Sequence, residues 1–216
     1  GWTIDATTRK RVWRMDFTET AHAGGSSKNR VAEKVLQLDQ GSYLVYFQTD
    51  DSHAYRSWNS GAPLERQDWG ISIFPATGEL DKSAIAPFDE AALNANVIAR
   101  IANVRDGVER GRTFRLDQDT DVQVYAIGEG TDGEMFDYAW IENTRTGKVV
   151  WEMTYRMTSH AGGAQKNRLY DDVIRLPAGD YSLRYKTDDS HSSAGWNADR
   201  PVDFERYGVT LKALKR

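Results

Sequence analysis

The stretch GDYSLRYKTDDSH, Gly179–His191, holds the two patterns from which the fold class follows. In its first half apolar side chains alternate with polar ones, and the apolar positions are Tyr181, Leu183 and Tyr185. A period of two places the apolar side chains on one face of a β-strand and the polar ones on the other. The second half, TDDSH, occurs once more in the chain, at Thr49–His53.

The repetition extends far beyond this motif, at a constant offset of 138 positions. Residues 13–73 match residues 151–211 at 23 of 61 positions without a gap. The matching segments include HAGG at 22–25 and 160–163, KNR at 28–30 and 166–168, and WN at 58–59 and 196–197. Agreement of this extent is not accidental, and the period is far too long for a solenoid repeat. We therefore expect two copies of one module.

Strand-like alternation recurs throughout the second copy. It is found at Trp151, Met153, Tyr155 and Met157, at Tyr207, Val209 and Leu211, and at Val122, Val124 and Ala126. Turn sequences separate these segments at residues 143–147, 160–163 and 177–180. Short strands at this spacing indicate an antiparallel sandwich or jelly roll. The predicted fold is all-β, with two tandem antiparallel β-sandwich, jelly-roll-like repeats.

We expect a first repeat at residues 1–75, a linker at 76–95 and a second repeat at 96–216. Alternation lapses in the linker, where Gly and Pro appear, and Asp89 can cap a brief helix over Asp89–Asn94. Copy two is preceded by Arg112–Ala139, which holds two expected strands, and copy one would need the same residues before Gly1. The first repeat is therefore expected to be incomplete at its N-terminus.

Five segments of copy two carry a resemblance to known modules: residues 114–116, 121–127, 137–141, Thr146-Gly147, and LPAGDY at 176–181. In these segments the chain resembles β-sandwich modules of secreted bacterial proteins, namely pre-peptidase C-terminal domains and GOLD-like jelly rolls. The resemblance covers about half of the chain, and the HAGG and TDDSH motifs depart from it. It implies a non-catalytic accessory module of a bacterial protein in a secreted, periplasmic or cell-surface location.

The composition excludes several classes of protein. Lys and Arg number 28 against 32 Asp and Glu, so the net charge is −4, opposite in sign to that of a typical nucleic-acid binder. No apolar run approaches the roughly 18 residues of a membrane-spanning helix. Cysteine is absent, which removes disulfides and thiolate metal sites. We expect a partner other than nucleic acid, and no membrane span.

All four histidines lie in the repeated segments, at matching positions in the two copies, and two aspartates precede the second histidine of each copy. In an extended chain Asp51 and His53 share a face, and His22 would complete a cluster suited to zinc or another divalent ion. The paired aspartates with loop carbonyls suit calcium instead. The predicted metal-ligating residues are His22, Asp50, Asp51 and His53 in copy one, and His160, Asp188, Asp189 and His191 in copy two.

A structural role for the same residues is the alternative, and the one we expect. Each copy carries a basic triplet, Lys28-Asn-Arg30 or Lys166-Asn-Arg168, whose charges complement the aspartate pair. A segment that contains both halves of a charge network favours a clasp between loops, with Lys166 or Arg168 bonded to Asp188 or Asp189. A ligand pocket that uses the basic residues is a third interpretation. The acidic segment Glu129–Glu134 lacks the spacing of a calcium-binding loop, and we expect it to be solvated.

Trp58-Asn59 and Trp196-Asn197 follow the histidine motifs and precede a proline. A tryptophan beside planar polar side chains is typical of sugar recognition. The alternative is that these tryptophans cover the end of the core, because aromatic side chains of this size are usually mostly buried.

The function we predict is a non-catalytic binding or adhesion module of a secreted or surface bacterial protein, with a glycan or cell-surface polymer as ligand. Its candidate ligand-binding residues are Trp58, Asn59, Trp196, Asn197, Lys28, Arg30, Lys166 and Arg168. The alternatives are a protein-interaction or assembly domain whose repeated motifs are architectural, and a metal-dependent hydrolase. Ser52 and His53 supply residue types of a hydrolytic triad, but neighbouring strand residues point to opposite faces, so we expect no enzyme.

Overall fold

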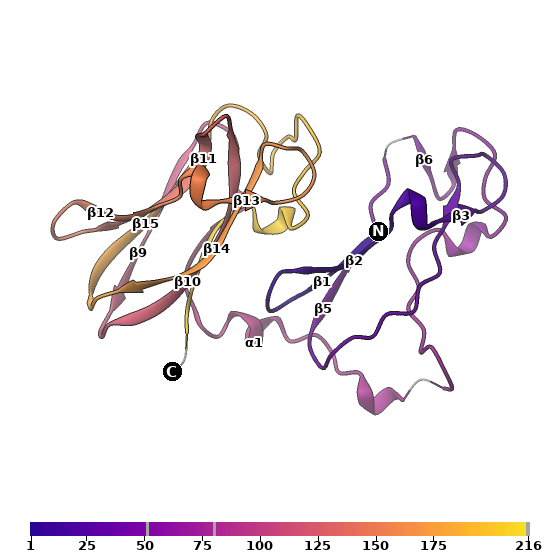
Figure 1. The fold of residues 1–216 in the computed structure, drawn as a ribbon, viewed down its shortest axis with the longest axis horizontal. Coiled ribbons are helices and arrows are strands. Elements are labelled where there is room, and N and C mark those ends of the chain that lie inside the picture. Colours follow the sequence, from indigo (N-terminus) through magenta and orange to yellow (C-terminus); the bar gives the residue numbers. More distant parts are fainter. Residues whose placement is uncertain (51, 80, 215–216) are drawn as a thin grey trace. The chain divides into compact units, whose positions relative to one another are not determined.

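The computed structural model describes residues 1–50, 52–79 and 81–214 (Figure 1). The chain forms two compact units, Gly1–Leu93 (unit 1) and Asn94–Arg216 (unit 2). Both consist mainly of short β-strands, and the ladders between named strands are antiparallel. The predicted antiparallel all-β class is therefore confirmed. Among the described residues no helix has the length and apolar character that crossing a membrane requires.

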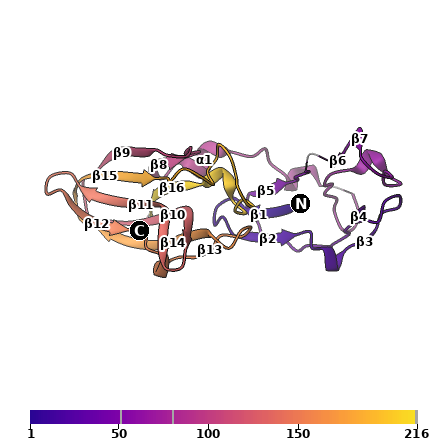
Figure 2. The same ribbon diagram turned by 90° about the horizontal axis from the view of Figure 1, so that it is seen from above.

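Unit 2 is built around one large sheet. Its strands are β8 (Val97–Ala102), β9 (Glu109–Leu116), β10 (Thr120–Thr131), β11 (Glu134–Asn143), β12 (Lys148–Glu152), β13 (Ser159–His160), β14 (Asn167–Leu176), β15 (Gly179–Lys186) and β16 (Gly208–Ala213). Two 3-10 helices, η4 (Tyr155–Met157) and η5 (Phe204–Arg206), lie in the loops. The strand order is β13-β14-β10-β11-β15-β9, while β16 joins β10 to β8 and β12 pairs with β11 (Figure 2).

The sheet nearly closes on itself along the long strand β10. This strand pairs with β14 and β16 over most of its length and with β11 at its end. The enclosed core follows the predicted period of two, with buried side chains at Val122, Val124 and Ala126 of β10, Tyr181, Leu183 and Tyr185 of β15, and Val209 and Leu211 of β16. Ala139 and Ile141 of β11 complete it.

The strand predicted through Met157 is shorter than expected. It ends at Glu152, and residues 155–157 form η4 instead. Thr158 closes this turn by donating its backbone N–H and its hydroxyl to the Tyr155 carbonyl. The alternation at Tyr155 and Met157 is therefore coincidental, because a local turn takes over where strand pairing stops.

Unit 1 has shorter elements. They are β1 (Trp2–Asp5), β2 (Arg11–Arg14), η1 (Phe17–Glu19), β3 (Ala21–His22), β4 (Arg30–Val31), β5 (Tyr43–Tyr46), β6 (His53–Ala54), β7 (Ser57–Trp58), η2 (Arg66–Asp68), η3 (Lys82–Ala84) and α1 (Glu90–Asn94). The carboxylate of Asp89 accepts a bond from the Ala92 backbone N–H at 3.0 Å, which confirms the predicted helix cap.

The ladders of unit 1 have counterparts in unit 2 at the sequence offset of 138. Trp2 pairs with Arg14 and Tyr46, as Trp140 pairs with Glu152 and Arg184. The β1–β2 and β11–β12 ladders each contain a bulge at the matching position, after Thr3 and after Ile141. The correspondence extends the sequence match to residues 2–12, whose identities with residues 140–150 are Trp2, Thr8, Lys10 and Val12.

Two segments of unit 1 differ from their counterparts. In unit 2 the corresponding segments form β14 and β16, and both pair with β10. Among the described residues of unit 1 no strand takes the place of β10, so residues 32–38 and 70–75 remain outside strands. Their apolar side chains are accordingly exposed, with Val35 at 76%, Ile73 at 67% and Phe74 at 78%.

Candidate functional site

A hydrogen-bonded network joins the repeated residues of unit 2. The His191 ring lies between two asparagines, with Nε2 2.6 Å from Asn167 Oδ1 and Nδ1 2.9 Å from Asn197 Oδ1. Lys166 Nζ donates to the same Asn197 oxygen at 2.6 Å. Asn167 Nδ2 in turn donates to the carbonyls of Gly162 and Asp199. The network ties three loops together through side chains that are separated in sequence.

The two glycines of the HAGG motif make this packing sterically feasible. Gly162 and Gly163 have φ angles of 80° and 69°, in the left-handed region that favours glycine. A Cβ on Gly163 would collide with the backbone carbonyl of Arg200. The motif therefore allows the 160–164 turn to approach the loop that carries Asp199.

Unit 1 contains the same network. His53 Nε2 lies 2.7 Å from Asn29 Oδ1 and its Nδ1 2.9 Å from Asn59 Oδ1, while Lys28 Nζ donates to Asn59 Oδ1. Arg30 donates to Thr20 and covers the Phe17 ring. Its counterpart in unit 2 behaves alike: Arg168 donates to Thr158 and covers Tyr155.

The structure gives the predicted metal-ligating histidines other partners. His22 and His160 each place Nε2 3.0 Å from a backbone carbonyl, of Ser26 and Ala164 respectively. Both ring nitrogens of His53 and His191 face asparagine oxygens, as described above. The geometry therefore does not bring the two histidines of either copy onto one ion.

The predicted aspartates divide into several environments. Asp50 accepts bonds from the backbone N–H groups of Ser52 and His53, and the bond from Ser52 holds the pKa of Asp50 below its ordinary value. Ser52 also donates its hydroxyl to Asp50. Asp51 lies outside the described residues, Asp189 is exposed, and Asp188 is partly buried.

The basic residues of the triplet in unit 2 bond to acceptors other than the expected aspartates. Lys166 bonds to Asn197 and to Glu129, with 2.7 Å between Nζ and Glu129 Oε1, and Arg168 bonds to Thr158. The predicted bonds from the triplet to Asp188 or Asp189 are therefore wrong for Lys166 and Arg168. Amide oxygens, hydroxyls and a distant glutamate are the acceptors instead.

Trp58 and Trp196 pack by their edges against other rings. Trp196 contacts His191 and Tyr207 with centroid distances of 5.0 Å each, and Trp58 contacts His53 and Trp69 at 4.9 and 5.0 Å. Both side chains are half-buried. Trp196 packs against the core of unit 2, as the alternative interpretation expects. Sugar binding by either tryptophan stays a prediction.

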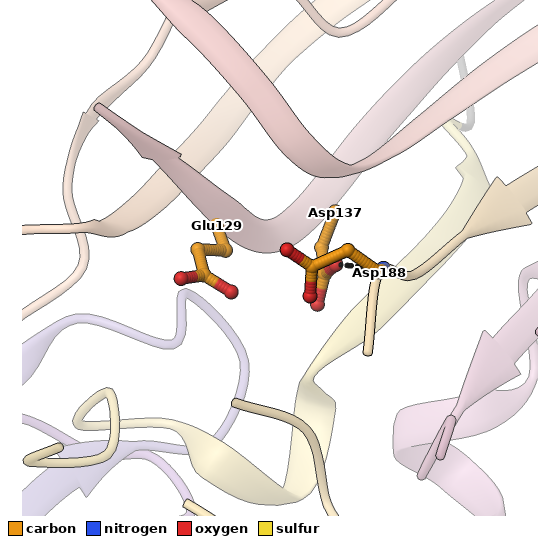
Figure 3. A group of neighbouring side chains, drawn as sticks. All are labelled: Glu129, Asp137 and Asp188. Carbon is orange, nitrogen blue, oxygen red and sulfur yellow. Dashed lines mark hydrogen bonds between the residues drawn. The ribbon is translucent and has the colours of Figure 1, made fainter. Parts of the chain in front are cut away.

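Three carboxylates that the sequence did not group together meet beside this network. They are Glu129 at the end of β10, Asp137 on β11 and Asp188 after β15, with one oxygen of each within 4.8 Å of the others (Figure 3). Glu129 and Asp137 are 4% and 0% exposed. The expectation of a solvated loop at Glu129 is wrong, because β10 extends to Thr131 and the carboxylate points inward.

Burial governs the electrostatics of this group. It raises the pKa of Asp137 to about 7, against the opposing effect of a hydrogen bond from the Tyr207 hydroxyl. Burial also raises the pKa of Glu129, although Lys166 counteracts it. The Asp188 backbone N–H donates to Asp137 Oδ1 at 2.8 Å, which holds the two aspartates together.

A second feature of unit 2 is a groove between β8 and β9. Its cavity of about 310 Å³ is lined by Arg100, Ile101, Ala102, Asn103, Val104, Arg105, Arg110, Gly111 and Arg112. Arg105, Arg110 and Arg112 are exposed, and within residues 1–50, 52–79 and 81–214 no carboxylate forms an ion pair with them. Their neighbour Glu109 pairs with Arg184. The groove is thus a concentration of positive charge on a chain of negative net charge.

No known protein family matches the sequence, and no curated protein matches it at a significant level. The function must therefore be inferred from the chemistry of the site.

Proposed function

We propose that this protein is a non-catalytic binding module whose unit 2 binds an acidic polysaccharide in the groove between β8 and β9. On this proposal the two units are copies of one jelly-roll-like module, and the protein works in a secreted, periplasmic or cell-surface location where such polymers occur. The ligand class follows from the groove, which replaces the tryptophans as the principal contact surface.

The observation that carries this proposal is the lining of the groove. Four arginines line a cavity of about 310 Å³ whose lining contains no carboxylate. Guanidinium groups form paired, charge-assisted hydrogen bonds with carboxylate and sulfate oxygens. Ile101 and Val104 also line the cavity, but they are buried in the core, so the arginines are the groups that would contact the ligand. Uronate and sulfated sugars share the chemistry that this lining recognises.

The position of the groove suits an extended polymer. β8 pairs only with β16 and β9 only with β15 among the described residues, so the groove lies where two strand edges face each other. On this proposal successive sugar units of the polymer lie along the edges of β8 and β9. The histidine networks support a non-catalytic role, because each ring is held by asparagine side chains and is not directed at a nucleophile.

Binding of the full chain to immobilised polysaccharides tests the proposal. Polygalacturonate and dextran sulfate separate uronate from sulfate recognition, and neutral dextran is the uncharged control. We expect binding to one or both anionic polymers, weakened by salt because the contacts are ionic. The double variant Arg110→Gln and Arg112→Gln should weaken binding at least tenfold, since a hydrogen bond to a charged group contributes about 1.5–3 kcal/mol.

The matched control removes two arginines from elsewhere in unit 2. Arg145 and Arg156 are exposed, and neither lines the groove. The variant Arg145→Gln and Arg156→Gln has the same net charge as the groove variant and should bind as the unaltered chain does. Equal losses in the two double variants would show nonspecific attraction, and no binding to either anionic polymer would refute the proposal.

A further inference from the structure

We propose that Glu129, Asp137 and Asp188 form a binding site for one divalent cation, with calcium as the favoured ion. This site is distinct from the arginine groove, and its occupancy does not depend on the polysaccharide proposal. Four features of the group support a cation site: its geometry, an unsatisfied buried oxygen, its charge and the type of its donor atoms.

The geometry brings three carboxylates from distant parts of the chain to one point. Glu129 and Asp137 are directly opposite each other in the β10–β11 ladder, and Asp188 follows β15. One oxygen of each lies within 4.8 Å of the others, and Figure 3 shows the three side chains as neighbours. Like charges directly opposite each other destabilise a strand pair. A cation between them converts this repulsion into attraction.

The second feature is an oxygen of Glu129 that has no partner. The Glu129 side chain is 5% exposed, and its Oε1 bonds to Lys166, but the buried Oε2 lacks any hydrogen-bond partner. Buried polar atoms are almost always satisfied, and each exception needs an explanation. The Glu129 carboxyl group neighbours those of Asp137 and Asp188, so an ion bound by the three would supply a partner for Oε2.

The charge of the group also calls for a cation. Lys166 is the single basic side chain paired with these carboxylates among the described residues, and it shares its ammonium group with Asn197. The carboxylate of Asp106 adds further negative charge near Glu129. Its own buried Oδ1 also has no hydrogen-bond partner. Lys166 offsets one of these negative charges, and a divalent ion bound beside it would offset two more.

The donor atoms select the kind of ion. All three side chains offer carboxylate oxygen, which hard cations such as calcium and magnesium prefer. The nearest histidine, His191, has both ring nitrogens in contact with Asn167 and Asn197, so no imidazole is free to favour zinc. Calcium accepts irregular sets of oxygen ligands completed by water, while magnesium requires a near-octahedral set. Calcium therefore fits the group better.

Titration of the chelator-treated full chain with calcium chloride tests the site. We expect one calcium ion per chain in calorimetry and a rise in the thermal midpoint that grows with calcium concentration. Magnesium should bind more weakly, and terbium should bind with luminescence sensitised by the neighbouring Trp196 and Tyr207. Absence of a calcium effect on both heat and thermal midpoint at millimolar concentration would overturn the proposal.

Two variants with a matched control locate the ion. Glu129→Gln and Asp188→Asn should each weaken calcium binding at least tenfold, whereas Glu134→Gln, an exposed position in the same hairpin, should bind as the unaltered chain does. Circular dichroism in the presence of chelator verifies that each variant is folded. If the loss of the Glu129 charge unfolds unit 2, the Asp188→Asn variant alone tests the site. Calcium binding unchanged in both variants would place the ion elsewhere and refute the assignment.

Discussion

At the scale of single residues, the histidine of each unit is held by asparagines. Asn167 Nδ2 donates to two backbone carbonyls, so its orientation is determined and Oδ1 must face His191. An oxygen acceptor at 2.6 Å requires that His191 Nε2 carry a hydrogen. In unit 1 Asn29 likewise donates Nδ2 to two backbone carbonyls, and its Oδ1 faces His53 Nε2. These residues recur in both copies because each satisfies several buried groups at once.

Asn167→Ala should therefore be strongly destabilising. The change leaves the Gly162 and Asp199 carbonyls and the His191 ring without their partner in a buried place. Each unsatisfied buried group costs about 1–3 kcal/mol, and we expect a loss of roughly 3 kcal/mol in the free energy of unfolding of unit 2. Urea unfolding followed by circular dichroism measures it.

The control for this variant is Gln165→Ala in the same turn. Gln165 is exposed, so its replacement should change the free energy of unfolding by no more than about 0.5 kcal/mol. Equal effects of the two replacements would mean that the network contributes nothing beyond ordinary turn residues.

At the scale of elements, the antiparallel pairing of β10 with β11 determines where Glu129 and Asp137 meet. The register shifts between Glu129 and Gly130, immediately after the Glu129–Asp137 pair. Gly128 permits this close approach, because a Cβ there would collide with the Asp137 backbone carbonyl. Because Glu129 and Asp137 are direct partners in this antiparallel ladder, their side chains lie on the same face of the hairpin.

Gly128→Ala should accordingly disturb both stability and the proposed cation site. The added methyl group must displace backbone, and overpacking of this kind costs about 1–3 kcal/mol. We expect a lower thermal midpoint and weaker calcium binding than in the unaltered chain. Gly195→Ala is the matched control, because nothing lies within 4 Å of a Cβ at that position. An unaltered thermal midpoint in the Gly128→Ala variant would show that β10 and β11 accommodate the added methyl group without loss of stability.

At the scale of the whole molecule, the two units bury very different amounts of apolar surface. The connected core belongs to unit 2, from Ala99 to Leu211, whereas unit 1 has Ile4 and Ala6 as its buried aliphatic side chains among the described residues. Exposed apolar residues such as Val35 and Phe74 add nothing to its stability. We expect the units to unfold separately, with unit 1 first.

Two truncations in the cores test this independence. Ile4 and Leu211 are both 0% exposed, one in each unit, and replacement by alanine costs about 2–5 kcal/mol in a packed core. Ile4→Ala should shift only the first transition in urea, and Leu211→Ala only the second, as followed by tryptophan fluorescence. A single transition displaced equally by both variants would contradict separate unfolding.

Much of the fold was readable from neighbouring residues. Alternation at Tyr181, Leu183 and Tyr185 predicts β15, and Asp89 predicts the start of α1, because both signals act over a few positions. The match of residues 13–73 to residues 151–211 is equally plain in the sequence. The match of the preceding residues 2–12 is not. Four identities in residues 2–12 are too sparse to recognise without the matching bulges of β1–β2 and β11–β12.

The sites depended on tertiary structure. Glu129 and Asp188 are separated by 59 residues, and only the register of β10, β11 and β15 brings them together. The arginine groove likewise arises where the edges of β8 and β9 face each other. A strand's period is set by the steric requirements of adjacent residues, whereas the meeting of distant charges is set by pairing across the whole sheet. The sequence therefore predicts the kind of elements, and the pairing of strands in the nearly closed sheet decides which of their side chains act together.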